Sequence, residues 1–180
     1  MSRPLHRGTA LCALLAASVA AGADGGVQST AAAPFALGLP DRPWQLLVEL
    51  PGFEMEPVQR LAGGARTLGR NARSALFISL TLATSPGDPS ARSCRDHDWA
   101  GRQKFPVVRE DTRLSAQGDK ARVEFLVPGD SKEAVQEKNV LLYLERDGVC
   151  AIVHLSQPGY RGAQDALELE RVLASVRFAP

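Results

Sequence analysis

The stretch that most constrains this fold is residues 139–156, where two apolar runs rich in β-forming side chains flank Asp147-Gly148. An Asp-Gly pair between such runs predicts a β-hairpin closed by a two-residue type I′ turn. Because side chains alternate between the two faces of a strand, the turn fixes which residues share a face. All but Arg146 in the predicted pairs are apolar, so we expect their face to lie in the core. The pairs are Arg146 with Val149, Leu144 with Ala151, Leu142 with Val153 and Val140 with Leu155.

The opposite face of this hairpin is mixed in character. We expect a loop or a sheet edge to cover it in part, since neither full burial nor full exposure suits its composition. Its members are Leu141, Tyr143, Glu145, Cys150, Ile152 and His154.

Residues 1–23 have the pattern of a secretory signal peptide. Arg3, His6 and Arg7 form a basic start, residues 9–21 form a short apolar run, and Ala21-Gly22-Ala23 fits a cleavage site before Asp24. Residues 18–20 are an alternative site. The run is shorter than the roughly 20 residues that span a bilayer, so no integral membrane segment is expected. The sequence therefore predicts a periplasmic or secreted bacterial protein, of the cell envelope or outside the cell.

Charge and length limit the possible partners and the number of domains. Loss of the signal peptide removes two of the 21 lysines and arginines and none of the 20 acidic residues, which leaves a net charge near −1. That balance gives no indication of a nucleic-acid partner or of attraction to an anionic membrane. The remaining length suits one domain with a hydrophobic core, and we expect a monomer.

Two cysteines, Cys94 and Cys150, remain in the mature chain. In an exported protein the pair favours a disulfide over two free thiols, although both alternatives stand at this point. Such a bond would close a loop of roughly 55 residues, which the chain-entropy model credits with about 4 kcal/mol.

The rest of the chain predicts an α+β domain over residues 43–180, preceded by a flexible lead-in over 24–42. Alternating patterns predict strands at 44–50, 66–71, 75–84, 106–113 and 121–127, and an edge strand or extended segment at 53–60. Residues 90–104 could hold a short helix, and 131–138 either a helix or an extended approach to the hairpin. An amphipathic helix is expected at 164–176, followed by a segment that folds onto a sheet edge. We expect five to seven mostly antiparallel strands with helices packed on them.

A metal site is the sharpest chemical candidate, because Cys94, His97, Cys150 and His154 are a Cys2His2 ligand set. Positions four apart on a straight strand lie about 13 Å from each other, so Cys150 and His154 cannot share one zinc. A pair of His97 with Asp96 or Asp98 remains, but two acidic neighbours and a histidine in a polar segment are more often a solvated surface. We therefore predict no metal and no cofactor.

The remaining candidates are single side chains on the same two segments. Trp99 either packs on the core or meets a partner, and His154 is either a half-buried histidine bonded to a neighbour or a functional group. Ser156 lies about 7 Å along the strand from His154, too far for a nucleophile and its base. We predict no catalytic residue, and the candidate functional surface is Asp96, His97, Asp98, Trp99 and His154.

The hairpin, the apolar strand at 76–82 and the terminal 169–178 segment, LERVLASVRF, together resemble the PsbP/Mog1-like group of small domains. The resemblance implies an antiparallel sheet sandwiched by helices, with a final helix running into a short strand. It also implies a non-enzymatic binding or accessory role with a protein or small-molecule partner. The alternative is a hydrolytic or metal-dependent enzyme using the 94–99 segment and His154, which requires His97, Asp98 and His154 to meet in one cleft. A ligand carrier would instead need an apolar cavity between sheet and helix.

Overall fold

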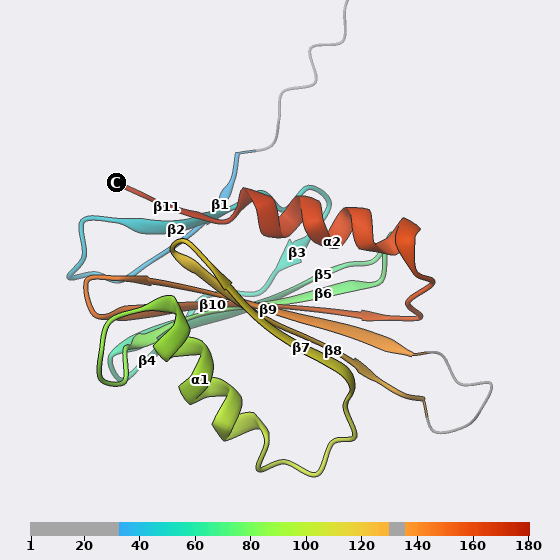
Figure 1. The fold of residues 1–180 in the computed structure, drawn as a ribbon. Coiled ribbons are helices and arrows are strands. Elements are labelled where there is room, and N and C mark those ends of the chain that lie inside the picture. The colour runs from blue at the N-terminus through green and yellow to red at the C-terminus, as the bar shows by residue number, and fades with distance from the viewer. Residues whose placement is uncertain (1–32, 130–135) are drawn as a thin grey trace, which may run out of the picture. The chain divides into compact units, whose positions relative to one another are not determined.

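The predicted hairpin forms strands β9 (Glu137–Arg146) and β10 (Val149–Pro158) in the computed structural model, which describes residues 33–129 and 136–180 (Figure 1). Asp147 and Gly148 have φ values of 51° and 76°, as the two central residues of a type I′ turn must. All four predicted cross-strand pairs occur, which confirms the register. The predicted signal peptide, residues 24–32 of the lead-in and residues 130–135 lie outside the described part of the chain.

The hairpin lies inside a large antiparallel sheet with the strand order β3-β5-β6-β10-β9-β8-β7, and β4 also pairs with β5. The sheet has eight strands instead of the five to seven expected, because the 53–60 segment supplies two short strands on either side of Pro57. Its other members are β3 (Glu54–Met55), β4 (Gln59–Leu61), β5 (Gly64–Asn71), β6 (Leu76–Thr84), β7 (Glu110–Gln117) and β8 (Lys120–Val127).

One face of the large sheet is covered by a three-stranded sheet and by helix α2 (Ala163–Ser175). The small sheet has the order β1-β2-β11, from β1 (Phe35–Gly38), β2 (Gln45–Val48) and β11 (Arg177–Ala179). Trp44, Leu46 and Val48 are buried against the apolar face of the hairpin, as their alternation predicts. Strand β1 falls inside the predicted flexible lead-in; the prediction was wrong there, because Leu37 is buried in the core and β1 pairs with β2.

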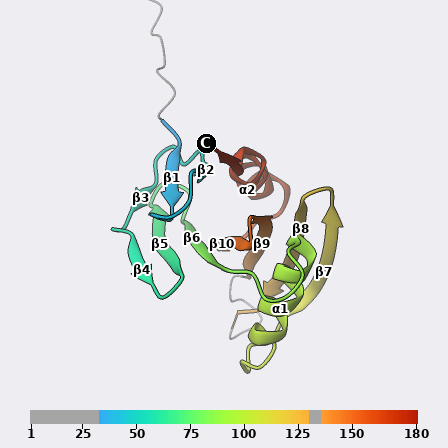
Figure 2. The same ribbon diagram turned by 90° about the vertical axis from the view of Figure 1, so that its left-hand side faces the viewer.

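Helix α1 (Ala91–Arg102) lies on the opposite side of the large sheet from α2 (Figure 2). Ser90 caps its N-terminus by accepting a hydrogen bond from the Ser93 backbone N–H at 3.0 Å. Cys94 forms a disulfide with Cys150 of β10, with a Cα–Cα distance of 5.8 Å. A helix, rather than a loop or an edge, therefore covers the β9 half of the hairpin's mixed face, whereas Ile152 and His154 of β10 are only partly buried. Leu141 and Tyr143 are fully buried beneath the helix.

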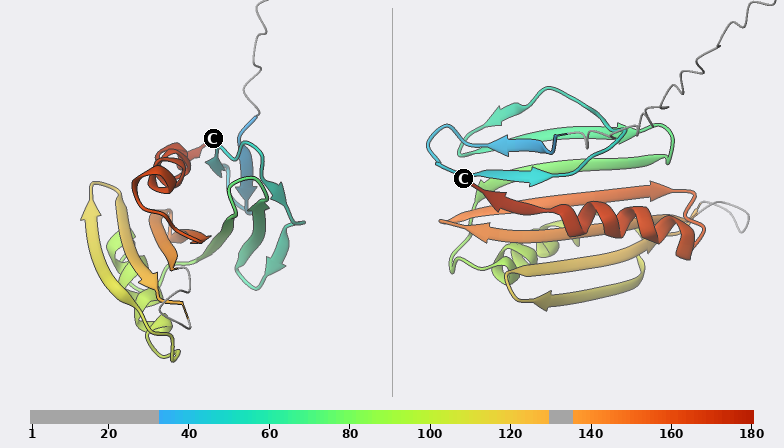
Figure 3. Two further views of the ribbon diagram at one scale, coloured as in Figure 1. Left: turned by 90° about the vertical axis from the view of Figure 1, so that its right-hand side faces the viewer. Right: turned by 90° about the horizontal axis from the view of Figure 1, so that it is seen from above.

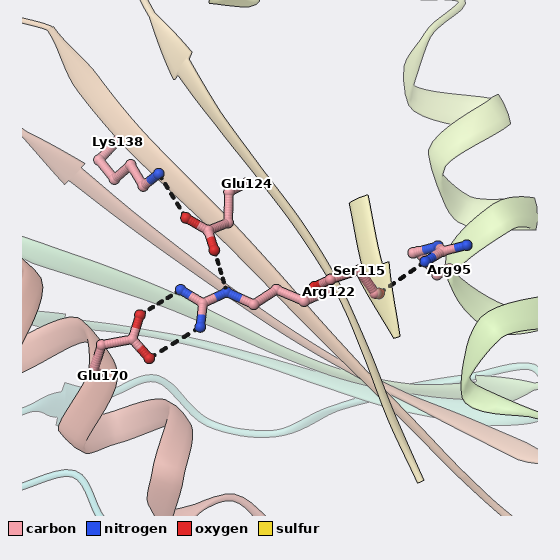
Figure 4. Close-up of polar contacts among 6 residues, drawn as sticks. All are labelled: Arg95, Ser115, Arg122, Glu124, Lys138 and Glu170. Carbon is pink, nitrogen blue, oxygen red and sulfur yellow. Dashed lines mark hydrogen bonds and ion pairs between the residues drawn. The ribbon is translucent and has the colours of Figure 1, made fainter. Parts of the chain in front are cut away.

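Strand β7 begins four residues later than predicted and forms an edge of the large sheet. All its residues are exposed, so no apolar alternation marks it in the sequence. The pairing with β8 shifts register between Glu110 and Arg113, where Asp111 has a φ of 49°. Arg95 of α1 donates a hydrogen bond to the Ser115 carbonyl at 2.8 Å (Figure 4). Together the irregular pairing and this side-chain contact protect the edge from further strand pairing.

Strand β8 is tied to α2 by a charged cluster (Figure 4). Arg122 donates to both carboxylate oxygens of Glu170 and also meets Glu124, which accepts from Lys138 at 2.8 Å. Burial alone would raise the pKa of Glu124, but the hydrogen bond from Lys138 and the neighbouring positive charges lower it. The cluster thus fixes the hairpin β7–β8 relative to α2.

Candidate functional site: a groove on the open face of the sheet

Helix α1 packs on β8 and β9 and leaves the same face of β5, β6 and β10 open. Figure 3 shows the order of these strands across the sheet. The pairing registers arrange the open side chains in three rows that run across β5, β6 and β10. These rows are Arg70, Phe77 and Ser156; Leu68, Ser79 and His154; and Arg66, Thr81 and Ile152.

The small side chain of Ser79 lies between larger neighbours in these rows, and a groove of about 820 Å³ opens above it. Residues 54–57, which include β3, line its side next to β5, and His154 and Ser156 line it on β10. The volume lies within the range usual for ligand sites. The lining of this groove combines polar and apolar side chains.

His154 is held in a chain of hydrogen bonds at the floor of the groove. Asn139 donates through Nδ2 to Glu137 at 3.0 Å, so its Oδ1 is the acceptor for His154 Nε2 at 2.8 Å. The ring proton is therefore assigned to Nε2, and Nδ1 keeps its lone pair. Burial and the positive charge of Arg102 lower the pKa of His154 to about 4, although Glu137 and Asp98 act in the other direction. The imidazole is neutral at physiological pH, donates to Asn139 through Nε2 and keeps an acceptor lone pair on Nδ1.

The rest of the groove combines charged and apolar groups. Arg70 approaches Glu54 at 3.4 Å, with both side chains well exposed, whereas Arg66 forms no ion pair within the described residues. The Phe77 side chain is 49% exposed, which is unusual for a large aromatic residue on a sheet floor. A ligand can therefore find a guanidinium, a neutral imidazole acceptor and an aromatic face in one hollow.

Of the five residues of the predicted functional surface, only His154 lies in the groove. Asp96 and His97 are exposed on α1, where Asp96 accepts a hydrogen bond from Arg95. Asp98 accepts from Arg102 at 2.6 Å and from the Tyr143 hydroxyl at 2.7 Å. Asp98 therefore connects α1 to the hairpin and is not free to bind a ligand with both oxygens.

Trp99 is buried and packs on Phe125, with ring centroids 5.5 Å apart. Of the two interpretations left open by the sequence, the structure therefore supports core packing. The Arg109 guanidinium lies 5.5 Å from the centroid of the Trp99 ring, a cation–π distance.

The possible Cys2His2 metal site is not formed, because both cysteines are in the disulfide. In residues 33–129 and 136–180, no three His, Cys, Asp or Glu side chains come together as metal ligands. His97, Asp98 and His154, which the enzyme alternative requires in one cleft, do not line the groove together. His97 is exposed on α1, His154 binds Asn139, and Ser156 donates its hydroxyl hydrogen to Glu137 at 2.7 Å.

Sequence reasoning missed Arg66, Phe77, Glu137 and Asn139 as site residues. Phe77 and Ser79 could be assigned to the outward face of their strand from the alternation alone. Their position beside His154 depends on the pairing of β6 with β10, and no local pattern indicates this pairing.

This combination of a large antiparallel sheet, a helix on either side and a terminal helix that runs into a short strand is a PsbP/Mog1-like fold. PsbP (CyanoP) from Synechocystis sp. PCC 6803 has a similar structure with a TM-score of 0.50 and 14% sequence identity, covering 88% of this chain and 98% of that one. Mog1p, a Ran-binding protein of Saccharomyces cerevisiae, gives a TM-score of 0.49 at 8% identity, covering 80% of this chain and 94% of its own. No protein-family model matches the chain, and no curated protein matches it in sequence. The similarity to PsbP (CyanoP) therefore shows the fold.

Proposed function

We propose that this chain is an exported, non-catalytic accessory protein that binds a protein or small-molecule partner in the groove beside α1. The observation that carries the proposal is the open hollow itself, where Arg66, Phe77 and His154 present three kinds of contact on one rigid sheet face. Binding sites typically combine an apolar lining with a few fixed polar groups. The fold supports an accessory role only as far as its resemblance to the PsbP/Mog1-like group implies one.

The polar groups of the groove suit binding better than catalysis. His154 is held neutral by burial and engages Asn139 through Nε2, and the hydroxyl of Ser156, two residues along the same strand, is bonded to Glu137. A nucleophile activated by a base would require the hydroxyl to donate to the imidazole. Within the described residues, neither Ser156 nor Ser79, which lies opposite His154 on β6, forms a hydrogen bond with the imidazole, so no hydroxyl at the site is activated by it.

Export is supported by the signal-peptide pattern of residues 1–23 and by the disulfide, which is typical of oxidising compartments. The test is cell fractionation of the full chain followed by N-terminal sequencing of the released protein. We expect a mature start at Asp24 in the periplasm or medium. A full-length chain retained in the cytoplasm would contradict export without affecting the groove.

Site-specific photocrosslinking tests the groove. Replacing Phe77 by p-benzoyl-phenylalanine changes a half-exposed aromatic residue into a crosslinker of related shape at the groove floor. The matched control carries the crosslinker at Leu167, which is 70% exposed on α2 and lies on the other side of the sheet. We expect a discrete adduct only from position 77 and its loss in an Arg66→Ala background. Equal labelling from both positions, or none from position 77 in the native compartment, would contradict the proposal.

A further inference from the structure

A second surface, independent of the groove, lies in the segment between α1 and β7. Residues 105–108 read Phe-Pro-Val-Val, and the side chains of Phe105, Val107 and Val108 are 66%, 45% and 65% exposed. The other exposed large apolar residues in the described part of the chain occur singly in the sequence. Figure 1 shows this segment projecting beyond the end of α1. We call residues 105–108 the apolar tip.

The apolar tip is held in place from its base. Arg109 donates through Nη1 to the Val107 carbonyl and through Nη2 to the Arg102 carbonyl, both at 2.9 Å. Its guanidinium also lies over the Trp99 and Phe125 rings, at 5.5 and 5.6 Å from their centroids. The Phe105 backbone N–H donates to the Arg102 carbonyl at 3.2 Å. These contacts keep the segment from folding its apolar side chains back onto the sheet, and a pre-ordered segment loses less entropy on binding.

The charged residues that directly flank the apolar tip, Lys104 and Arg109, are basic. Residues 102–109 contain Arg102, Lys104 and Arg109 and no acidic residue. Arg102 is paired with Asp98, whereas Lys104 forms no ion pair within the described residues and directly precedes Phe105. Acidic residues resume at Glu110. Basic side chains that flank exposed apolar groups match the arrangement by which peripheral proteins enter the interface of an anionic membrane.

We propose that the apolar tip inserts into the surface of a phospholipid bilayer, with Lys104 facing the lipid headgroups. The three side chains fall well short of the roughly 800 Å² that a stable protein interface buries on each partner. A bilayer interface needs no matching concave partner, and a few inserted side chains beside a basic residue give reversible binding. The near-neutral net charge of the mature chain does not oppose this, because the contact is local.

The first experiment places a tryptophan at the apolar tip. Trp44 and Trp99 are buried, so the fluorescence of Phe105→Trp reports the new indole against a constant background. The matched control is Leu167→Trp on α2. With vesicles of equimolar phosphatidylcholine and phosphatidylglycerol, we expect the emission of Phe105→Trp to shift to the blue and to be quenched by brominated acyl chains. No shift, or an equal shift of Leu167→Trp, would overturn the proposal.

The second experiment measures binding by co-sedimentation with the same vesicles. The double variant Phe105→Ser/Val108→Ser should lower the partition coefficient at least about tenfold, as expected for loss of two partly inserted apolar side chains. Leu167→Ser should bind like wild type, and Lys104→Glu should weaken binding only when phosphatidylglycerol is present. If the double variant binds the vesicles like wild type, insertion of the apolar tip is refuted. Insertion is also refuted if the apolar tip mediates self-association and not lipid binding. Crosslinking from Phe77 is unaffected in either case, so this test is separate from that of the groove.

Discussion

Removing the disulfide should test the link between the two cysteines and the stability of the whole domain. The perturbation is the double variant Cys94→Ala/Cys150→Ala, which avoids free thiols and leaves small apolar side chains at two buried positions. The bond joins residues 56 apart, and the chain-entropy model gives about 4 kcal/mol for a loop of that length. Domains of this size have a total free energy of unfolding of about 5–15 kcal/mol. We therefore expect the variant to fold but to lose a large share of its stability.

The assay is equilibrium unfolding in urea, followed by far-ultraviolet circular dichroism on the mature chain without reducing agent. Besides a lower midpoint, we expect a steeper dependence on urea, because the unfolded variant is free to expand. Hydrogen exchange should be fastest in α1, which loses its covalent attachment to β10. Intact mass of the wild type should fall two hydrogens below that of its reduced form. A loss of less than about 1 kcal/mol in a variant with a native spectrum would refute the entropic reasoning.

Three further changes test other parts of the structure. Because the pKa of His154 is lowered in the folded state, the unfolded chain binds a proton at this residue first as the pH falls. The contribution of the neutral imidazole to stability is complete above about pH 6.5 and is lost as the pH falls to about 4. In His154→Gln the melting temperature should therefore change less with pH over that interval than in the wild type. Tyr143→Phe removes the hydrogen bond to Asp98 in a fully buried position and should cost about 1–2 kcal/mol by chemical denaturation, a prediction that an unchanged midpoint would contradict. Gly148→Ala should lower the free energy of unfolding by about 1 kcal/mol, because the φ of 76° disfavours a side chain even though the space around Gly148 is open. Gly101→Ala in α1, also in open space, should raise the free energy of unfolding by up to about 1 kcal/mol. Equal effects of the two changes would refute the turn assignment.

The sequence predicted best the elements whose evidence is local. The Asp147-Gly148 turn and the flanking alternation determined the register of β9 and β10, since both signals lie within 18 adjacent residues. The sequence predicted helix α1 only as one option, because the helix has no continuous apolar stripe. Its buried residues are Ala91, Cys94, Arg95 and Trp99, and the disulfide contributes to the attachment that an apolar stripe provides in other helices. Strand β7 was displaced in the prediction because an edge strand with no buried residue has no hydrophobic period.

The candidate site was harder to predict because it depends on pairing between distant strands. Ser79 and His154 face each other through the antiparallel pairing of β6 with β10, and Leu68 joins the same row through β5. No local signal ranks this order of strands above others. The residues 94–99 attracted attention because they combine cysteine, histidine and carboxylates, yet most of them attach α1 to the sheet or face solvent.

The open groove follows from the sizes of the parts. A helix of 12 residues such as α1 is about 18 Å long at 1.5 Å per residue, whereas a sheet of eight strands is over 30 Å wide at about 4.8 Å per strand. The other described helix, α2, packs on the opposite face. A single short helix cannot cover both halves of its face, and the disulfide fixes it over the half that carries Leu141 and Tyr143. The strands left uncovered must tolerate water, which explains the polar residues Arg66, Ser79 and Thr81 on their open side. Phe77 is exposed among these polar residues although water does not favour an exposed aromatic ring. For this reason position 77 is where the crosslinker tests the groove most directly.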